Sequence, residues 1–138
     1  MTEKGTLSGK KHPVLIADDH QLILTGLQIV IGESDSFYVC SAGRSGEDVY
    51  TYLKEKVPRI AVLDIGMASG EAIRKEVDPA VIERIEKAGL REPTQYGGLL
   101  VVSWLKARYP DLGILIITQQ ESPQVIAAAA ELQVDGVM

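Results

Sequence analysis

The chain has 138 residues, of which 46% are hydrophobic and 24% charged, a composition typical of one globular domain rather than a disordered or fibrous chain. A formal net charge of −5 argues against a direct nucleic-acid surface, because phosphate contacts need clustered Lys and Arg. The single cysteine excludes an internal disulfide, and no apolar run approaches the roughly 20 residues that span a bilayer, so we expect a cytoplasmic protein without membrane contact.

The first half of the chain alternates short apolar runs with helical segments. Residues 1–13 lack an apolar run and predict a disordered leader, so the domain is expected to occupy 14–138. The next predicted elements, in chain order, are a buried strand at 14–17, a helix at 21–31, a strand at 37–41 and a helix from 45 to about 56. Ser45 is the expected N-cap of the last of these, with Asp48 at its third position.

The second half repeats the alternation after an interruption. The predicted elements are a strand at 60–63 that ends at Asp64, a helix at 99–108, a strand at 114–117, a helix at 124–132 and a strand at 134–138. Strands that alternate with helices indicate βαβ units, hence a parallel sheet with helices on both faces. We therefore predict a doubly wound α/β fold with five parallel strands in the order 2-1-3-4-5.

Acidic residues follow two of the predicted strands. Asp18 and Asp19 come after the first strand, and Asp64 ends the third. Right-handed crossovers place the carboxyl ends of all parallel strands along one edge, where ligands bind in such sheets. Three carboxylates at one edge repel each other unless a cation lies among them, and Mg²⁺ prefers oxygen ligands. An aspartate beside Mg²⁺ can accept a phosphoryl group, and Thr118, after the fourth strand, could donate a hydrogen bond to it.

Each of these residues also has an ordinary structural interpretation. Asp18 or Asp19 could cap the following helix, Asp64 with Gly66 could form a turn, and Thr118 could be a cap. Their combination at one edge of the predicted sheet favours a ligand-binding site over these structural roles.

Several stretches resemble the receiver domains of two-component response regulators, particularly those of LuxR type. The opening run 14–27 reads VLIADDHQLILTGL, and the third strand with its continuation, 58–67, reads PRIAVLDIGM. The run 98–110 reads GLLVVSWLKARYP, and the match continues through 114–118 and 134–136. The resemblance covers about 14–67 and 98–138.

The resemblance implies specific roles for these residues. Asp64 is the implied phosphoacceptor and Thr118 the switch hydroxyl. Asp18 and Asp19 are the implied acidic pair that holds Mg²⁺ together with Asp64 and the carbonyl of Gly66. A histidine kinase is the implied donor, a second copy of the chain is a candidate partner, and DNA is implied only through an output domain that these residues do not encode.

The sequence departs from the family pattern after Asp64. An insertion occupies about 68–97, too long for an ordinary βα loop. Asp78-Pro79 predicts a helix start and Gly89 its end, and an apolar stripe runs along 80–88, which Ile73 and Val77 could extend upstream. Glu83 and Lys87 are spaced as an i,i+4 ion pair. The helix either packs on its own domain or offers a partner surface or lid beside Asp64.

Three further departures concern the second half. Gln119 stands where the family has a small residue, and Val137 stands where it has a switch aromatic. The family's lysine and its last helix would lie beyond Met138, so we expect a receiver truncated at its C-terminus.

The alternative function is a pseudo-receiver that acts without phosphorylation through its insertion. A haloacid-dehalogenase-like phosphohydrolase fits less well, because Gly66 stands where that family needs a second aspartate.

Overall fold

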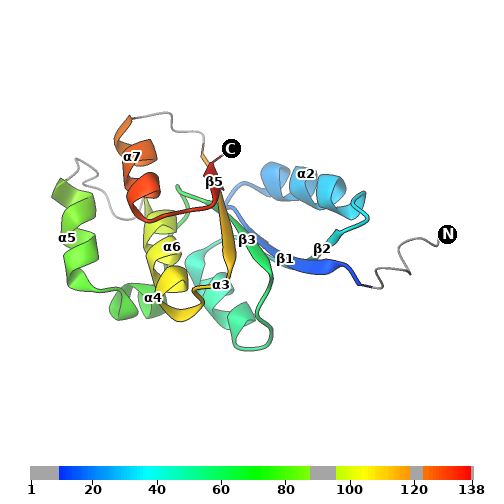
Figure 1. Cartoon of the computed structure of the whole chain (residues 1–138), viewed down its shortest axis with the longest axis horizontal. Coiled ribbons are helices and arrows are strands. Elements are labelled where there is room, and N and C mark those ends of the chain that lie inside the picture. The colour runs from blue at the N-terminus through cyan, green and yellow to red at the C-terminus, as the bar shows by residue number, and fades with distance from the viewer. Residues whose placement is uncertain (1–9, 88–95, 119–122, 138) are drawn as a thin grey trace.

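The computed structural model describes residues 10–87, 96–118 and 123–137, and these form a five-stranded sheet (Figure 1). The strands are β1 (His12–Ala17), β2 (Phe37–Gly43), β3 (Ile60–Asp64), β4 (Gly113–Ile117) and β5 (Gly136–Val137). They pair in parallel in the order β2-β1-β3-β4-β5. The predicted fold class and strand order are therefore confirmed.

Helices cover both faces of the sheet. They are α2 (Gln21–Gly32), α3 (Gly46–Leu53), α4 (Glu71–Glu76), α5 (Pro79–Lys87), α6 (Gly97–Arg108) and α7 (Pro123–Glu131). Alternate residues of β1 serve the two faces: Leu15 packs in the larger core with α3, α6 and α7, whereas Val14 and Ile16 pack in a smaller core with α2. No helix in the described part of the chain is long and apolar enough to cross a membrane.

Most boundaries differ from the prediction by one or two residues, and those of β1 and α3 have a clear physical reason. β1 begins at His12 rather than at 14, because the His12 N–H donates to the Ser36 carbonyl at 2.7 Å and His12 pairs with Phe37. The end of the predicted leader, 12–13, is thus part of the sheet. α3 begins as predicted, since Ser45 accepts a hydrogen bond from the Asp48 N–H at 3.4 Å, but it ends at Leu53.

The insertion forms two helices where one was predicted. α4 ends at Glu76 because Val77 is extended and Pro79, which lacks an N–H, starts a new helix. The sequence missed α4 because six residues carry too little apolar periodicity to reveal a helix. Ile73 and Val77 do not extend the stripe of α5, but both are buried in the larger core.

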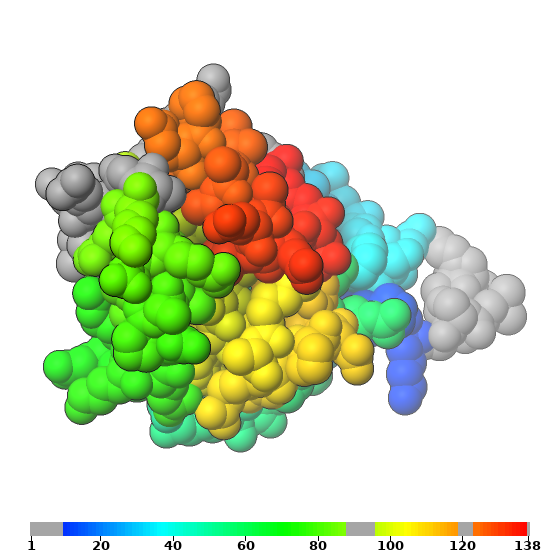
Figure 2. Space-filling model, turned by 60° about the vertical axis from the view of Figure 1, so that its left-hand side comes forward, coloured from blue at the N-terminus to red at the C-terminus, as the bar shows by residue number. Residues whose placement is uncertain are grey.

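The second inserted helix packs on its own domain. Val81, Ile82 and Ile85 of α5 face the larger core, and α5 lies beside α7 in the space-filling view (Figure 2). Lys87 and Glu83 form the expected ion pair, with 3.9 Å between Nζ and Oε2. This result favours the first of the two interpretations of the insertion. The predicted end of the helix at 88–89 lies outside the described residues.

Candidate functional site

The end of β1 places two carboxylates at the carboxyl edge of the sheet. The Asp18 N–H donates to the Gly43 carbonyl at 3.0 Å, so the sheet continues one residue past β1. Asp18 is 2% exposed, whereas the side chain of Asp19 is about half exposed. Neither carboxylate caps α2, because the N-cap position is held by His20 and has no side-chain cap hydrogen bond. The capping interpretation of Asp18 and Asp19 is therefore wrong.

The end of β3 buries a third carboxylate next to this pair. Asp64 is 6% exposed and pairs in register with Ile117 of β4. Its Oδ1 accepts a hydrogen bond from the Gly66 N–H at 3.1 Å, so the predicted turn is also present. Its Oδ2 is buried and has no hydrogen-bond partner in the structure. A buried acceptor without a donor is costly, and it indicates a place for a ligand that the protein itself does not supply.

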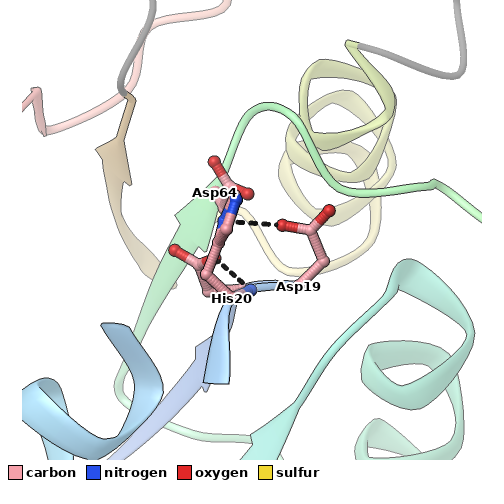
Figure 3. A group of neighbouring side chains, drawn as sticks. Asp19, His20 and Asp64 are labelled. Atoms are coloured by element: carbon pink, nitrogen blue, oxygen red, sulfur yellow. Dashed lines mark hydrogen bonds and ion pairs between the residues drawn. The ribbon is translucent and has the colours of Figure 1, made fainter. Parts of the chain in front are cut away.

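These carboxylates gather around one histidine. Asp18, Asp19, His20 and Asp64 each offer one ligand atom, and these atoms lie within 4.8 Å of one another. His20 Nδ1 is 3.0 Å from Asp18 Oδ1. It is also 2.9 Å from Asp19 Oδ1, a contact drawn in Figure 3. The convergence of the three aspartates was predicted. His20 was not, although its position beside Asp19 at the start of a helix was a signal in the sequence.

The surroundings of Asp64 work against its negative charge. Burial, and to a smaller extent the charges of Asp18 and Asp19, raise the pKa of Asp64 to about 7, while the hydrogen bond from Gly66 acts in the opposite direction. For His20 the hydrogen bond to Asp18 and the charge of Asp19 raise the pKa above 6.5. The raised pKa values of Asp64 and His20 both act against the accumulation of negative charge at this edge of the sheet.

The donor set fits a divalent cation. Among the described residues no lysine or arginine forms an ion pair with Asp18, Asp19 or Asp64. An octahedral Mg²⁺ needs one or two carboxylates, with water completing its shell. The unpartnered Oδ2 of Asp64 is an oxygen that such an ion can satisfy.

The absence of a side chain at Gly98 allows the start of α6 to pack closely against the backbone that follows Asp64. A Cβ on Gly98 would collide with the carbonyl oxygen of Asp64 and lie 2.6 Å from the Cα of Ile65. The Gly98 N–H donates to the Ile65 carbonyl at 2.9 Å, which ties the start of α6 to the end of β3. The position of Asp64 thus depends on a residue that lies beyond the insertion.

The remaining predicted site residues lie at the same edge. Thr118 follows Ile117, the register partner of Asp64, and is half-buried. Its role as a switch hydroxyl and the role of the Gly66 carbonyl stay predictions. Val137 pairs with Ile116 in β5 and is 45% exposed. Gln119 lies outside the described residues.

Known proteins resemble this chain in sequence. No protein-family model matches it. The oxygen regulatory protein NreC of Staphylococcus epidermidis is 23% identical over 82% of the chain and 40% of its own length. The transcriptional regulatory protein RcsB of Escherichia coli K12 is 19% identical over 91% of the chain and 47% of its own length. The chain therefore spans less than half the length of these relatives.

Solved structures of RcsB share the fold. The isolated receiver (REC) domain of Salmonella enterica RcsB, determined with the phosphomimetic BeF₃⁻, gives a TM-score of 0.70 at 18% identity, covering 94% of this chain and 77% of that one. An RcsB–DNA complex gives a TM-score of 0.72 at 18% identity, covering 94% of this chain and 52% of that one. In sequence this chain is similar to the NreC and RcsB regulators, and it shares the fold of the RcsB receiver domain.

Proposed function

We propose that this domain takes a phosphoryl group from a histidine kinase onto Asp64 in a Mg²⁺-dependent step and thereby switches an output. The observation that carries the proposal is the Asp64 carboxylate, which is buried among like charges with one oxygen unpartnered. A carboxylate whose pKa is raised to about 7 is costly to keep ionised unless a cation binds beside it. Such a strongly perturbed group at the edge of a parallel sheet is a candidate for chemistry rather than for stability.

Different residues of the site would have different roles in the phosphoryl transfer. Asp18, Asp19 and Asp64 would hold Mg²⁺ with the Gly66 carbonyl, and the ion supplies positive charge that lowers the pKa of Asp64 and offsets charge on the phosphoryl oxygens. An Asp64 carboxylate oxygen then attacks the phosphorus. A P–O bond forms, the P–N bond of the donor phosphohistidine breaks, and the leaving imidazole takes up a proton. Thr118 would donate a hydrogen bond to a phosphoryl oxygen.

The test is covalent modification followed by intact mass. We would incubate the protein with Mg²⁺ and phosphoramidate, beside Asp64→Asn and a control, Asp111→Asn, whose aspartate is exposed at the far end of the sheet. One added phosphoryl group is expected on the parent and on Asp111→Asn, and none on Asp64→Asn or with excess chelator. An adduct on Asp64→Asn, or no adduct on any protein, would refute the proposal.

The output is inferred from the relatives. NreC and RcsB are named as regulatory proteins, and solved RcsB structures include DNA complexes and dimers. We infer that phosphorylation of Asp64 biases a two-state equilibrium that controls transcription through a DNA-binding domain outside this chain, with a second copy as partner.

The alternative is a pseudo-receiver that binds a partner through its insertion without phosphorylation. The described part of the insertion gives this alternative little support, because Ile73, Val77 and Ile85 are buried in the domain's own core. Partner binding that persists unchanged in Asp64→Asn, together with no phosphoryl adduct on the parent, would favour it.

A further inference from the structure

Two adjoining hollows open at the amino ends of β3 and β4, at the opposite end of the sheet from Asp64. The larger has a volume of about 510 Å³ and lies between the connection from α3 to β3 and the connection from α6 to β4. The smaller, of about 160 Å³, lies between α3 and the end of α6. Arg108 and Tyr109 line both hollows, which we together call the amino-edge groove.

Basic side chains are spaced along this groove. Arg59 and Arg108 line the larger hollow, and Arg108 and Lys54 line the smaller one. Arg108 is oriented by Glu76, whose Oε1 lies 3.0 Å from its Nη1, and by the ring of Trp104, whose centroid is 5.4 Å from its guanidinium carbon. In the described part of the chain the Glu76 contact occupies one guanidinium nitrogen, and the side chain is 54% exposed, so further N–H donors are open to a ligand.

Apolar surface lies between these charges, on walls that backbone hydrogen bonds hold in place. Val57 in the larger hollow is 50% exposed, and Leu112 beside it is buried. The Arg59 N–H donates to the Pro13 carbonyl at 2.8 Å, which ties one wall to β1. The Leu112 N–H donates to the Tyr109 carbonyl at 3.0 Å, which closes a turn in the other wall. The groove is thus formed before a ligand arrives, and binding costs little ordering of the protein.

An extended peptide with alternating acidic and apolar residues fits such a surface. Successive side chains of an extended chain point to opposite sides, so its carboxylates can lie along the cations while its apolar side chains fill the hollows. The planar fork of donors in arginine suits a carboxylate. A nucleic-acid strand fits less well, because it carries a phosphate at every nucleotide and Asp111 lies in the larger hollow.

We propose that the amino-edge groove binds an acidic, partly apolar peptide segment of a partner protein. The carboxylates of the segment contact Lys54, Arg59 and Arg108, and its apolar side chains enter the two hollows. The insertion takes part through Glu76, which orients Arg108. Because the groove lies at the opposite end of the sheet from Asp64, this binding needs neither Mg²⁺ nor phosphorylation and goes beyond the proposed function.

The test is titration with a short acetylated and amidated peptide of the repeat Glu-Leu, followed by calorimetry and by the fluorescence of Trp104. Trp104 is the only tryptophan of the chain and lines the smaller hollow, so its emission reports on the groove. The same peptide with Gln in place of Glu, and an oligothymidine, are titrated in parallel. The variants are Lys54→Glu, Arg59→Glu and the two together. Lys87→Glu is the matched control, since it reverses an exposed charge on α5, outside the groove.

We expect the Glu-Leu peptide to bind the parent and Lys87→Glu equally well. Its affinity should fall about tenfold in Lys54→Glu and in Arg59→Glu, and further in the double variant, because each change places a negative charge against the peptide. Added salt should weaken the binding to the parent. Urea unfolding shows whether each variant keeps its fold.

Four outcomes would overturn the proposal. They are equal affinity of the parent for the Glu-Leu and Gln-Leu peptides, undiminished binding by the folded double variant, no binding to the parent at millimolar peptide, and tighter binding of oligothymidine than of the peptide. None of them bears on the phosphoryl adduct at Asp64, so this proposal and the proposed function stand or fall separately.

Discussion

Asp64 ends β3 and Glu76 lies in the connection from β3 to α6, and the two carboxylates have opposite surroundings. Asp64 is buried near two other aspartates, accepts one backbone N–H and has a pKa raised to about 7. Glu76 ends α4 at the surface, where Trp104 Nε1 donates to it at 2.8 Å, Arg108 at 3.0 Å and the Tyr50 hydroxyl at 3.3 Å. The Trp104 hydrogen bond lowers the pKa of Glu76, and the charge of Arg108 adds to this effect.

The difference separates a structural carboxylate from a functional one. Every group that Glu76 needs comes from α3 and α6, so it fastens the insertion to the domain and has no use for an external ion. Asp64 lacks such partners, and its position costs free energy until a cation or a proton arrives. The burial of both inserted helices' apolar residues agrees with a structural role for this part of the insertion.

The largest expected effect is a pH-dependent stabilisation by Asp64→Asn. The folded pKa of about 7 lies above the ordinary 3.8, so the folded protein holds more protons between these values and loses stability as pH rises through them. The full penalty is present above pH 7 and amounts to at most about 4 kcal/mol. Urea unfolding should therefore show Asp64→Asn to be more stable than the parent at pH 8, with the advantage gone at pH 4.

Mg²⁺ supplies the control for this prediction. Saturating Mg²⁺ at pH 8 should stabilise the parent and narrow its gap to Asp64→Asn, since the ion binds only the folded carboxylates. If the parent protein is already as stable as Asp64→Asn at pH 8 without Mg²⁺, then groups of the protein itself stabilise the Asp64 carboxylate, as they do for Glu76.

The next effect concerns the backbone that positions Asp64. Gly98→Ala places a methyl group against the carbonyl of Asp64 and the Cα of Ile65, and backbone cannot yield as a side chain can. We expect a loss of about 2–3 kcal/mol in the free energy of unfolding, and weaker binding of Mg²⁺ at Asp64. Gly26→Ala, in α2 with nothing within 4 Å of the new Cβ, is the matched control and should stabilise slightly. Equal stability of the two variants would contradict the close approach.

The parallel sheet and the cluster of aspartates at its carboxyl edge were predictable, because the sequence signals for them are local and strong. Buried β-branched runs such as 60–63 mark strands, and parallel topology alone brings Asp18, Asp19 and Asp64 to one edge. His20 was missed because a lone histidine has no periodicity, and its rotamer depends on where the three carboxylates come to lie.

The insertion was harder to predict because long-range contacts define it. α4 has only six residues, and its place is fixed by Glu76 reaching residues 26 to 32 positions away in the chain. No local pattern signals such partners. By contrast, α5 was predicted from Asp78-Pro79 and its apolar stripe, because those signals lie within the helix itself.

A smaller effect is expected where the insertion meets α6. Trp104→Phe removes the N–H that Glu76 accepts and part of a buried side chain that contacts Tyr50 with 5.4 Å between ring centroids. We expect a loss of about 1–2 kcal/mol in urea unfolding. The rise in stability on adding Mg²⁺ should stay that of the parent. If this variant also lost its response to Mg²⁺, the two carboxylates would be coupled rather than separate.

The smallest effect is that of Glu76→Gln, and it tests the comparison most directly. The amide still accepts the Trp104 N–H but loses the charge that attracts Arg108. Because the folded pKa of Glu76 is lowered, its charge stabilises the fold above pH 4.5, and this contribution is lost as pH falls through the folded pKa. Thermal unfolding should show a slightly lower Tm for Glu76→Gln at pH 7 and no difference in strong acid. The sign is opposite to that of Asp64→Asn, so one pair of pH titrations separates the carboxylate that the protein satisfies from the one it leaves for a cation.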